Sequence, residues 1–459
     1  MRFDELPPVY GGIEGGACVS PKIMGSLKIS LFVLIGLVWW CNTILAEDYS
    51  FEIPAKAEAK EAKLEWSGNL DGKYTLFQTR ASSPLYGLQF FGAGAVSDYL
   101  SQYQLELYLN GDYQRKSLGL HLKSHLNYLK VANATEADSV ALDIFELYGN
   151  LDLSINSSIQ AGKIRYNWGK GYAFNPVGYV NSVKNPENPE LAQAGLLSAR
   201  FETIKSFQSR VLKTAALTAI VIPPQAEIKD RFGEAENTDV AAKLYLMLGN
   251  MDCDLLGYYS KANPKRIGAD FAVNLKENIE LHGEVSYVQD NPKSTIADNR
   301  VLNAKEDGYA YLVGLRWLNK WEITTIFEYY HTAAGFTQDE FDAYLAFFRQ
   351  SLASGKEDLI KLAAGVMQNN FSGNTLMQDY LYLQVQKPEP FDLLYFTPSI
   401  SAIYNILDKS LLLAINLIYQ PVTNFEFDLK PTFMFGKDDS EYGSQRFQQR
   451  VEAWLRFYF

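Results

Sequence analysis

Residues 450–459 read RVEAWLRFYF, and their side chains alternate between two kinds. The apolar set consists of Val451, Ala453, Leu455, Phe457 and Phe459. The set between them consists of Arg450, Glu452, Trp454, Arg456 and Tyr458. Successive side chains of a β-strand point to opposite faces of the sheet. The stretch therefore predicts a strand with one apolar face and one polar face.

The same alternation recurs along most of the chain before this stretch. Examples are 105–109, 118–128, 240–248, 267–275, 279–287 and 309–317. These segments run for roughly 10–14 residues, enough to cross a bilayer at a tilt, whereas strands of soluble β-sandwiches usually have about 5–6. A soluble protein of several β-domains is the alternative, and the long unbroken series argues against it.

The alternating segments number about eighteen, although sixteen is also compatible with the pattern. They begin near residues 64, 100, 117, 142, 158, 196, 209, 239, 252, 266, 279, 308, 321, 375, 393, 410, 424 and 448. Eight connections between them are predicted to be tight, at 112–116, 154–157, 207–208, 249–251, 276–278, 319–320, 387–391 and 420–423. The connections between these turns are mostly long. Short turns that alternate with long loops are typical of outer-membrane barrels.

In this strand pattern, and in its last residue Phe459, the chain resembles the outer-membrane β-barrel proteins of Gram-negative bacteria. The resemblance implies a transmembrane antiparallel up-and-down barrel over residues 64–459, with short periplasmic turns and long extracellular loops. It also implies that Phe457 and Phe459 form an assembly signal read by the barrel-assembly machinery. Residues 162–169, GKIRYNWG, followed by Asn175 and Pro176, resemble a GK…WG…NP element of large porin-like barrels, several of which have no assigned substrate.

The N-terminal segment predicts export. Residues 29–40, ISLFVLIGLVWW, carry no charge and are too short for a membrane helix, which needs about 20 residues. They suit a secretory signal peptide spanning 1–46 and cleaved after Ala46, with Met24 as an alternative start. An uncleaved anchor helix, or a lipoprotein signal at Cys41, is the weaker interpretation. Residues 47–63 are expected to form a short periplasmic tether.

Composition limits the chemistry of the protein. The 459 residues carry a net charge of −11, 47% of them are hydrophobic, and there are only 4 His and 3 Cys. Removal of the signal peptide would leave Cys253 as the remaining cysteine, so no internal disulfide is expected. The sequence contains no CxxC, HExxH, GxSxG or P-loop motif. We therefore expect no enzyme activity, cofactor, metal or nucleic-acid partner.

Two long loops are candidates for narrowing the lumen. The first spans 169–194, is rich in proline and aromatic residues, and carries Tyr172 and Phe174. Beside it lie Lys163, Arg165, Arg200 and Glu202, which we predict to form the constriction together with the two aromatic side chains. The second, 333–374, predicts two helices with capping boxes that begin at Thr337 and Ser354. Their apolar stripes would be 341, 344, 345 and 348, and 359, 362 and 363.

These observations predict a channel in the outer membrane of a Gram-negative bacterium. Small hydrophilic solutes or ions would diffuse through a lumen with more acidic than basic side chains, which favours cations. The alternative is a barrel that serves as scaffold or conduit for a partner protein or an exported polymer. Outer-membrane lipid and lipopolysaccharide would surround the barrel. Whether the barrels assemble into oligomers cannot be deduced from the sequence.

Overall fold

The computed structural model describes residues 62–92, 97–132, 137–182, 194–223, 238–297, 300–371, 373 and 375–459. The predicted signal peptide, nearly all of the predicted tether and the second half of the 169–194 loop lie outside these ranges. Among the described residues, no helix has the length and apolarity needed to span a bilayer.

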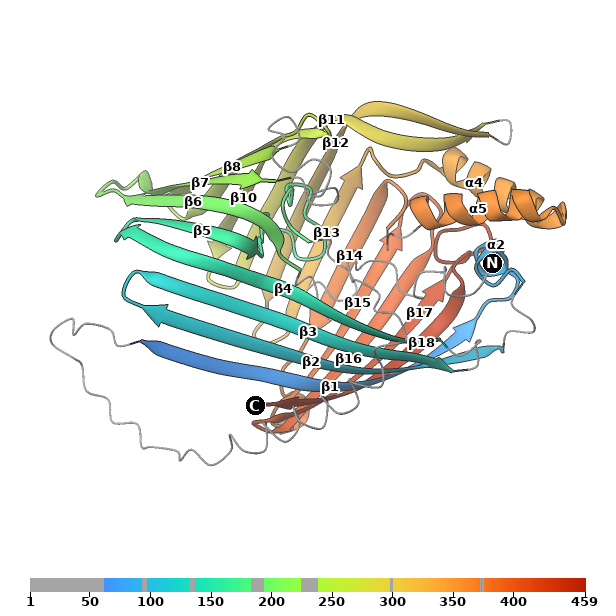
Figure 1. Cartoon of the computed structure of the whole chain (residues 1–459), viewed down its shortest axis with the longest axis horizontal. Coiled ribbons are helices and arrows are strands. Elements are labelled where there is room, and N and C mark those ends of the chain that lie inside the picture. Colours follow the sequence, from blue (N-terminus) through green and yellow to red (C-terminus); the bar gives the residue numbers. More distant parts are fainter. Residues whose placement is uncertain are drawn as a thin grey trace.

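The described residues form one closed sheet of eighteen antiparallel strands (Figure 1). The strands are β1 Lys63–Thr79, β2 Tyr99–Arg115, β3 Leu118–Ala132, β4 Ala137–Ser154, β5 Ser157–Ile164, β6 Leu196–Ser206, β7 Leu212–Ile222, β8 Asp239–Leu248, β9 Met251–Tyr259, β10 Lys265–Lys276, β11 Ile279–Ala297, β12 Arg300–Leu318, β13 Thr324–Thr332, β14 Asp379–Gln386, β15 Phe396–Asn405, β16 Leu411–Val422, β17 Phe425–Phe435 and β18 Phe447–Tyr458. Each strand pairs with its neighbours in the sequence, and β1 closes the barrel by pairing with β18. The predicted fold class is therefore confirmed, with the larger of the two strand numbers.

The strands begin within four residues of the predicted positions, except that β4 and β12 start earlier, at Ala137 and Arg300. The predicted tight turns are short connections at one end of the barrel. The turn predicted at 387–391 is longer than expected, because it extends to Tyr395 and contains a 3₁₀ helix, Pro390–Asp392. β11 and β12 form a hairpin that runs well beyond its neighbours at the opposite end, since β12 pairs with β13 only from Ala310 onward.

Strand β18 shows which face of the wall is inside. Val451, Leu455 and Phe457 have exposed side chains, whereas Glu452 and Trp454 are buried. The apolar face predicted from the sequence therefore points outward and the polar face lines the lumen. Phe459 continues the pairing, because its backbone exchanges two hydrogen bonds, of 2.9 and 3.0 Å, with Gly68 on β1. Its ring covers Gly68 so closely that a Cβ there would meet the ring at 2.6 Å.

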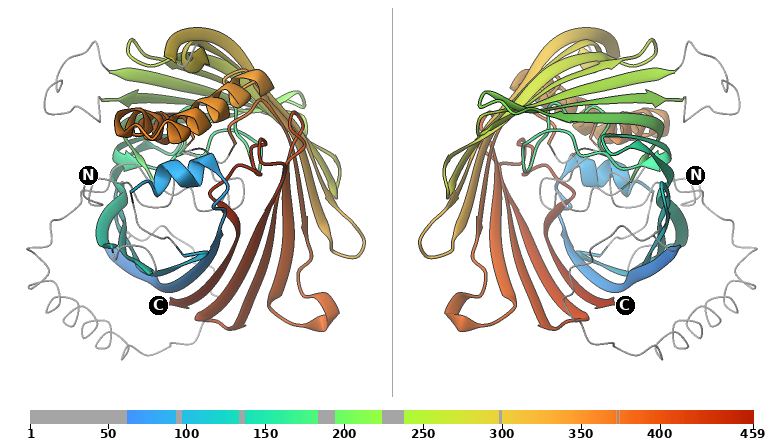
Figure 2. Two further views of the ribbon diagram at one scale, coloured as in Figure 1. Left: turned by 90° about the vertical axis from the view of Figure 1, so that its right-hand side faces the viewer. Right: turned by 90° about the vertical axis from the view of Figure 1, so that its left-hand side faces the viewer.

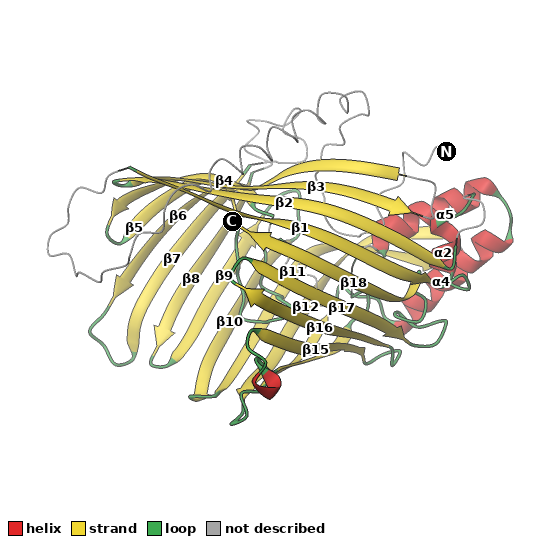
Figure 3. Cartoon of the chain, turned by 90° about the horizontal axis from the view of Figure 1, so that it is seen from below, coloured by secondary structure: helices red, strands yellow, loops and turns green. Residues whose placement is uncertain are grey.

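Three helices lie together at the end with the long loops: α2 (Pro84–Gln89), α4 (Gln338–Ala353) and α5 (Glu357–Asn370) (Figures 1 and 3). The capping box at Thr337 is present, and the predicted stripe of α4 is buried. Two predictions for α5 are wrong. Ser354 caps the end of α4 and Lys356 begins α5, so the second capping box does not form. Leu359 and Leu362 are exposed, because α5 turns Ile360, Ala363, Val366 and Met367 toward α4 and the barrel.

Candidate functional site

The connection from β5 to β6 enters the barrel. Its described part, 165–182, lies inside the ring of strands (Figure 2). Phe174 packs among side chains of β12–β14, and Trp168, Val177 and Tyr179 pack on apolar side chains of β7, β8 and β9. We call residues 165–182 the inner loop. Because its contacts are with inward-facing side chains of β7 to β14, it occupies one side of the lumen.

Glu284, on β11, holds the middle of the inner loop. Its Oε1 accepts hydrogen bonds from the backbone N–H groups of Lys170 and Gly171, both at 2.6 Å, and from Asn175 Nδ2 at 2.8 Å. Its Oε2 accepts the Val177 N–H at 3.2 Å. The carboxylate is buried, and donors from the loop surround it. Four hydrogen bonds from the loop to one buried side chain fix this part of the loop firmly.

A second buried carboxylate, Glu328 on β13, continues the attachment. It accepts the backbone N–H of Tyr172 at 2.5 Å and that of Ala173 at 3.0 Å. On its other side Oε1 lies 3.1 Å from Nε2 of the buried His282. Phe174 then stacks on Tyr330, two residues along β13, with ring centroids 4.5 Å apart. Strands β11 and β13, which lie on either side of β12, therefore hold the five consecutive loop residues 170–174.

Two glycines permit this close approach. Gly169 has a φ of +97°, and a Cβ there would meet the Glu284 carboxylate at 2.6 Å. A Cβ on Gly171 would lie 2.0 Å from the Phe174 carbonyl oxygen. Glycine alone adopts such a backbone conformation at low cost and leaves space for a ligand or carboxylate. The two glycines of the GKG sequence at 169–171 are therefore needed for the inner loop to pack this closely against the wall.

Lys170 lies between these glycines and extends its side chain to the wall. Its Nζ lies 3.1 Å from Asp254 Oδ2 on β9 and 3.9 Å from Asp270 Oδ1 on β10. Burial opposes the charged form of the lysine, but the two aspartates outweigh it and raise the pKa of Lys170. The ammonium is therefore charged at neutral pH, and it completes a third attachment of the inner loop.

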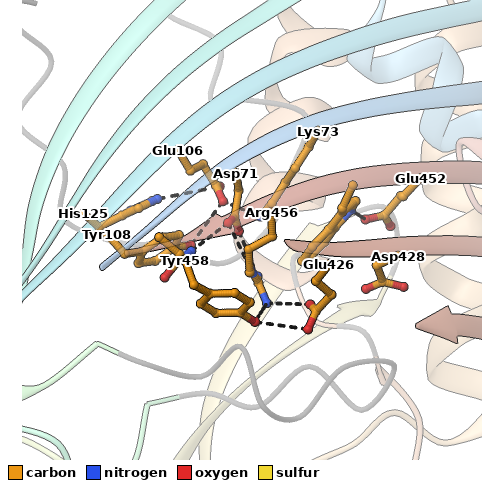
Figure 4. Close-up of polar contacts among 12 residues, drawn as sticks. Asp71, Lys73, Glu106, Tyr108, His125, Glu426, Asp428, Glu452, Arg456 and Tyr458 are labelled. Atoms are coloured by element: carbon orange, nitrogen blue, oxygen red, sulfur yellow. Dashed lines mark hydrogen bonds and ion pairs between the residues drawn. The ribbon is translucent and has the colours of Figure 1, made fainter. Parts of the chain in front are cut away.

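The wall across the lumen carries a network of paired charges (Figure 4). Arg456 on β18 donates to both carboxylate oxygens of Asp71 on β1, at 2.8 and 2.9 Å, and to Glu426 on β17 at 3.1 Å. Lys73 is ion-paired with Glu106. The ammonium groups of Lys73 and Lys430 each lie 3.8 Å from the ring centroid of Trp454. These cations have acidic partners on the wall, so this side of the lumen is close to neutral.

The predicted constriction residues divide into three groups. Tyr172 and Phe174 lie in the inner loop, but Phe174 is buried and serves to seat it. Arg200 and Glu202 lie together on the lumenal face of β6, 4.0 Å apart. Arg165 follows β5, is exposed, and lies near the lumenal Lys123, with which its charge interacts.

Lys163 does not face the lumen with the other predicted constriction residues. It is the register partner of Leu147, whose side chain is half exposed on the outer face. Partners in an antiparallel pair share a face, so Lys163 lies on the outward side of β5. The neighbouring Ile164 takes the inward position because it packs beneath Trp168 and Val177 of the inner loop.

The alternation of side chains puts Glu284 and Glu328 on the polar, lumenal face of their strands but does not connect them to the loop. A signal is present in residues 169–173, GKGYA, because two glycines and no carboxylate or amide side chain leave their backbone N–H groups available, and lumenal acids are suitable acceptors. The alternation of polar and apolar residues does not identify which of the lumenal acidic side chains bind the loop. Within the described ranges, no group of three or more His, Cys, Asp or Glu side chains is arranged to hold a metal ion.

No family model matches the chain, and no curated protein matches it. Similar solved structures do exist. OccAB1 of Acinetobacter baumannii is 10% identical, with 88% of this chain and 99% of that chain covered and a TM-score of 0.53. OccK8 (OprE) of Pseudomonas aeruginosa is 9% identical, with 86% and 98% covered and a TM-score of 0.50. At such identities the likeness concerns the fold. The chain is therefore an all-β protein whose fold, a closed eighteen-stranded antiparallel barrel, is similar to that of these solved structures.

Proposed function

We propose that this protein is an outer-membrane channel through which small hydrophilic solutes or ions diffuse, and that the inner loop narrows the passage. The observation that carries the proposal is the closed barrel with an apolar outer face and a charged inner face. Backbone N–H and C=O groups must be paired in hydrocarbon, and only a closed barrel achieves this with strands. A barrel of about 16–18 strands leaves an aqueous channel. The solved structures that share the fold, OccAB1 and OccK8, are outer-membrane porins.

The constriction would lie between the inner loop and the opposite wall. Arg165, Arg200 and Glu202, with Tyr172 of the loop, supply polar groups beside the passage. Mechanistically the channel selects by width and by wall charge, with no covalent step and no catalytic residue. The excess of acidic side chains on the lumenal face favours cations. A conduit for a protein or polymer is disfavoured, since the inner loop is bonded to the wall through its backbone.

The same proposal includes the path to the membrane. Residues 1–46 would be removed as a signal peptide, 47–63 would remain as a periplasmic tether, and the barrel-assembly machinery would read Phe457 and Phe459. Lipid and lipopolysaccharide would contact exposed apolar side chains such as Leu142 and Ile267. These are expectations from the sequence and the character of the outer face.

Planar-bilayer recording of the refolded mature chain tests the function directly. Stable single-channel steps with a modest preference for K⁺ over Cl⁻ are expected. A folded barrel, verified by its heat-modifiable migration on electrophoresis, that gives no conductance would contradict the channel and favour an occupied barrel. A mature chain that is monodisperse in water without detergent would contradict the membrane location.

A further inference from the structure

Three aspartates form a cluster on the wall beneath the inner loop: Asp252 and Asp254 on β9, and Asp270 on β10. Asp254 and Asp270 are register partners, so their side chains stand on the same face of adjacent strands. They are 1% and 3% exposed. Like charges directly opposite each other on a sheet are destabilising, and burial increases that cost. A cation or a shared proton between the two groups relieves this repulsion.

In the structure the cation is the ammonium group of Lys170, which reaches the pair from the inner loop. It is the one cation among the described residues that is ion-paired with either aspartate. This single ammonium group serves both aspartates, and its contact with Asp270 is the longer of the two. Tyr245 donates a hydrogen bond of 2.5 Å to Asp252, which provides a neutral donor and no charge.

The site has acceptors that Lys170 leaves unused. In the described part of the molecule, no backbone N–H, amide or hydroxyl group donates a hydrogen bond to either carboxyl oxygen of Asp270 or to Asp254 Oδ1, and the two carboxyl groups lie against each other. These oxygens are buried, and a buried acceptor without a donor is costly. The pair therefore has unused hydrogen-bonding capacity, directed at the place where the Lys170 ammonium lies.

From this arrangement we infer that Asp254 and Asp270 form a binding site for a primary ammonium group on the lumenal wall, and that Lys170 is its tethered occupant. An amine-bearing solute in the lumen would compete with Lys170 for the site. The inference rests on the proposed channel only in that the lumen delivers the solute. A primary ammonium fits because it offers three N–H donors to carboxylate oxygens, as the lysine does.

The Lys170 ammonium group can leave the two aspartates without detachment of the inner loop from the wall. Glu284 binds the backbone N–H of Lys170, and Glu328 binds the two residues Tyr172 and Ala173. These hydrogen bonds do not involve the lysine side chain. Exchange of the ammonium therefore needs only rotation of four side-chain bonds, while the loop stays attached to β11 and β13.

The test compares ethylammonium with tetramethylammonium, which has the same charge but no N–H. In Lys170→Met the side-chain stem is kept and the site is emptied. Ethylammonium is expected to raise the thermal midpoint of this variant in detergent by about 2 °C more than tetramethylammonium does at equal concentration. The wild-type protein is expected to respond equally to both cations.

Two further variants give the controls. Lys170→Met combined with Asp270→Asn should lose the difference between the two cations. Lys243→Met removes a neighbouring lumenal lysine that stacks at 6.0 Å on Trp168, and should behave as the wild type does. Equal shifts with both cations in Lys170→Met, or a difference that persists in the double variant, would overturn the inference.

Conductance provides a second readout. In Lys170→Met, ethylammonium should reduce the K⁺ current with saturation at a concentration about tenfold lower than in the wild type. Absence of any conductance in the wild type would contradict the channel but leave the thermal measurement intact. Failure of the proposed channel and failure of the inferred ammonium site therefore give different results.

Discussion

Two buried glutamates determine where the inner loop lies, and each does so through backbone N–H groups. Glu284 and Glu328 together accept five backbone N–H groups from residues 170–177. The Asn175 amide, the buried Phe174 ring and the glycines at 169 and 171 complete the attachment from the side of the loop. The position of the loop therefore depends on residues of the wall as well as on the sequence of the loop itself.

Replacement of Glu284 by glutamine should loosen the inner loop. The amide keeps an acceptor oxygen but lacks the charge, and its NH₂ group faces loop donors. We expect a loss of about 2–3 kcal/mol in unfolding free energy and larger open-channel current noise. Urea unfolding in detergent micelles and single-channel recording measure the two effects. Glu280→Gln on the same face of β11, where Glu280 accepts a 3.3 Å hydrogen bond from the Tyr172 hydroxyl, is the matched control with a smaller effect.

Arg165 tests the assignment of the constriction. Arg165→Glu changes the local charge by two units beside the lumenal Lys123, so the reversal potential in a KCl gradient should shift further toward K⁺. Arg300→Glu, an exposed position on the β11–β12 hairpin beyond the barrel, makes the same charge change and should leave the reversal potential as it was. Unaltered selectivity in Arg165→Glu would contradict the placement of this residue at the constriction.

At the scale of the elements, the sequence predicted the strands well and the loops poorly. Alternation defines a strand wherever one face meets lipid and the other meets water, and most strands here satisfy that condition. Alternation does not identify the inward face of a strand where the side chains on that face are apolar. Ile164 turns inward because the inner loop covers it, which moves Lys163 to the outside. In α5, the burial of Ala363 is confirmed and that of Leu359 and Leu362 is wrong, because the partners of this helix come from distant segments.

The closing strands allow a test of the register between β1 and β18. Gly68→Ala places a Cβ 2.3 Å from the Tyr108 carbonyl oxygen and against the Phe459 ring, so the fraction of folded barrel should fall markedly. Gly72→Ala on the same strand meets no atom within 4 Å and should fold as the wild type does. Heat-modifiable migration on electrophoresis gives the folded fraction. Equal yields from both variants would show that this contact is unimportant for closure.

A buried carboxyl group in the loop between β17 and β18 should make the stability of the protein depend on pH. Glu441 in this loop is fully buried and accepts hydrogen bonds from the Leu376 N–H, the Tyr380 hydroxyl and the Asn405 amide, so it joins its loop to the segment before β14 and to the ends of β14 and β15. Burial raises the pKa of Glu441 to about 8, against the effect of these donors and with a smaller contribution from Asp408. The folded protein therefore binds this proton more tightly than the unfolded chain does.

The stability contributed by this proton is fully present below pH of about 4.5 and is lost as the pH rises through about 8. We expect the thermal midpoint to fall over that range in the wild type. Glu441→Gln keeps an acceptor oxygen but cannot ionise, so its curve should be flatter and lie above that of the wild type at pH 8. Parallel curves for the two proteins would contradict the assignment.

Considered as a whole molecule, the barrel has an asymmetric lumen. One side is occupied by the inner loop with its acidic attachment points, and the other carries cations that are already paired (Figure 4). The closed sheet and its polarity follow from the sequence pattern. The asymmetry does not, because it depends on which loop folds inward and which acids receive it. Those contacts join segments more than 100 residues apart.

The pairing of β1 with β18 also has a kinetic consequence. Asp71 and Arg456 are 385 residues apart, so the seam can form only after nearly the entire barrel sequence has emerged. Until that moment the growing sheet has two unpaired edges, which are ready templates for aggregation. Contacts of such long sequence separation form slowly. Copies of the chain that meet before closure can therefore pair edge to edge, and the rate at which the seam forms should limit how fast folded barrels appear.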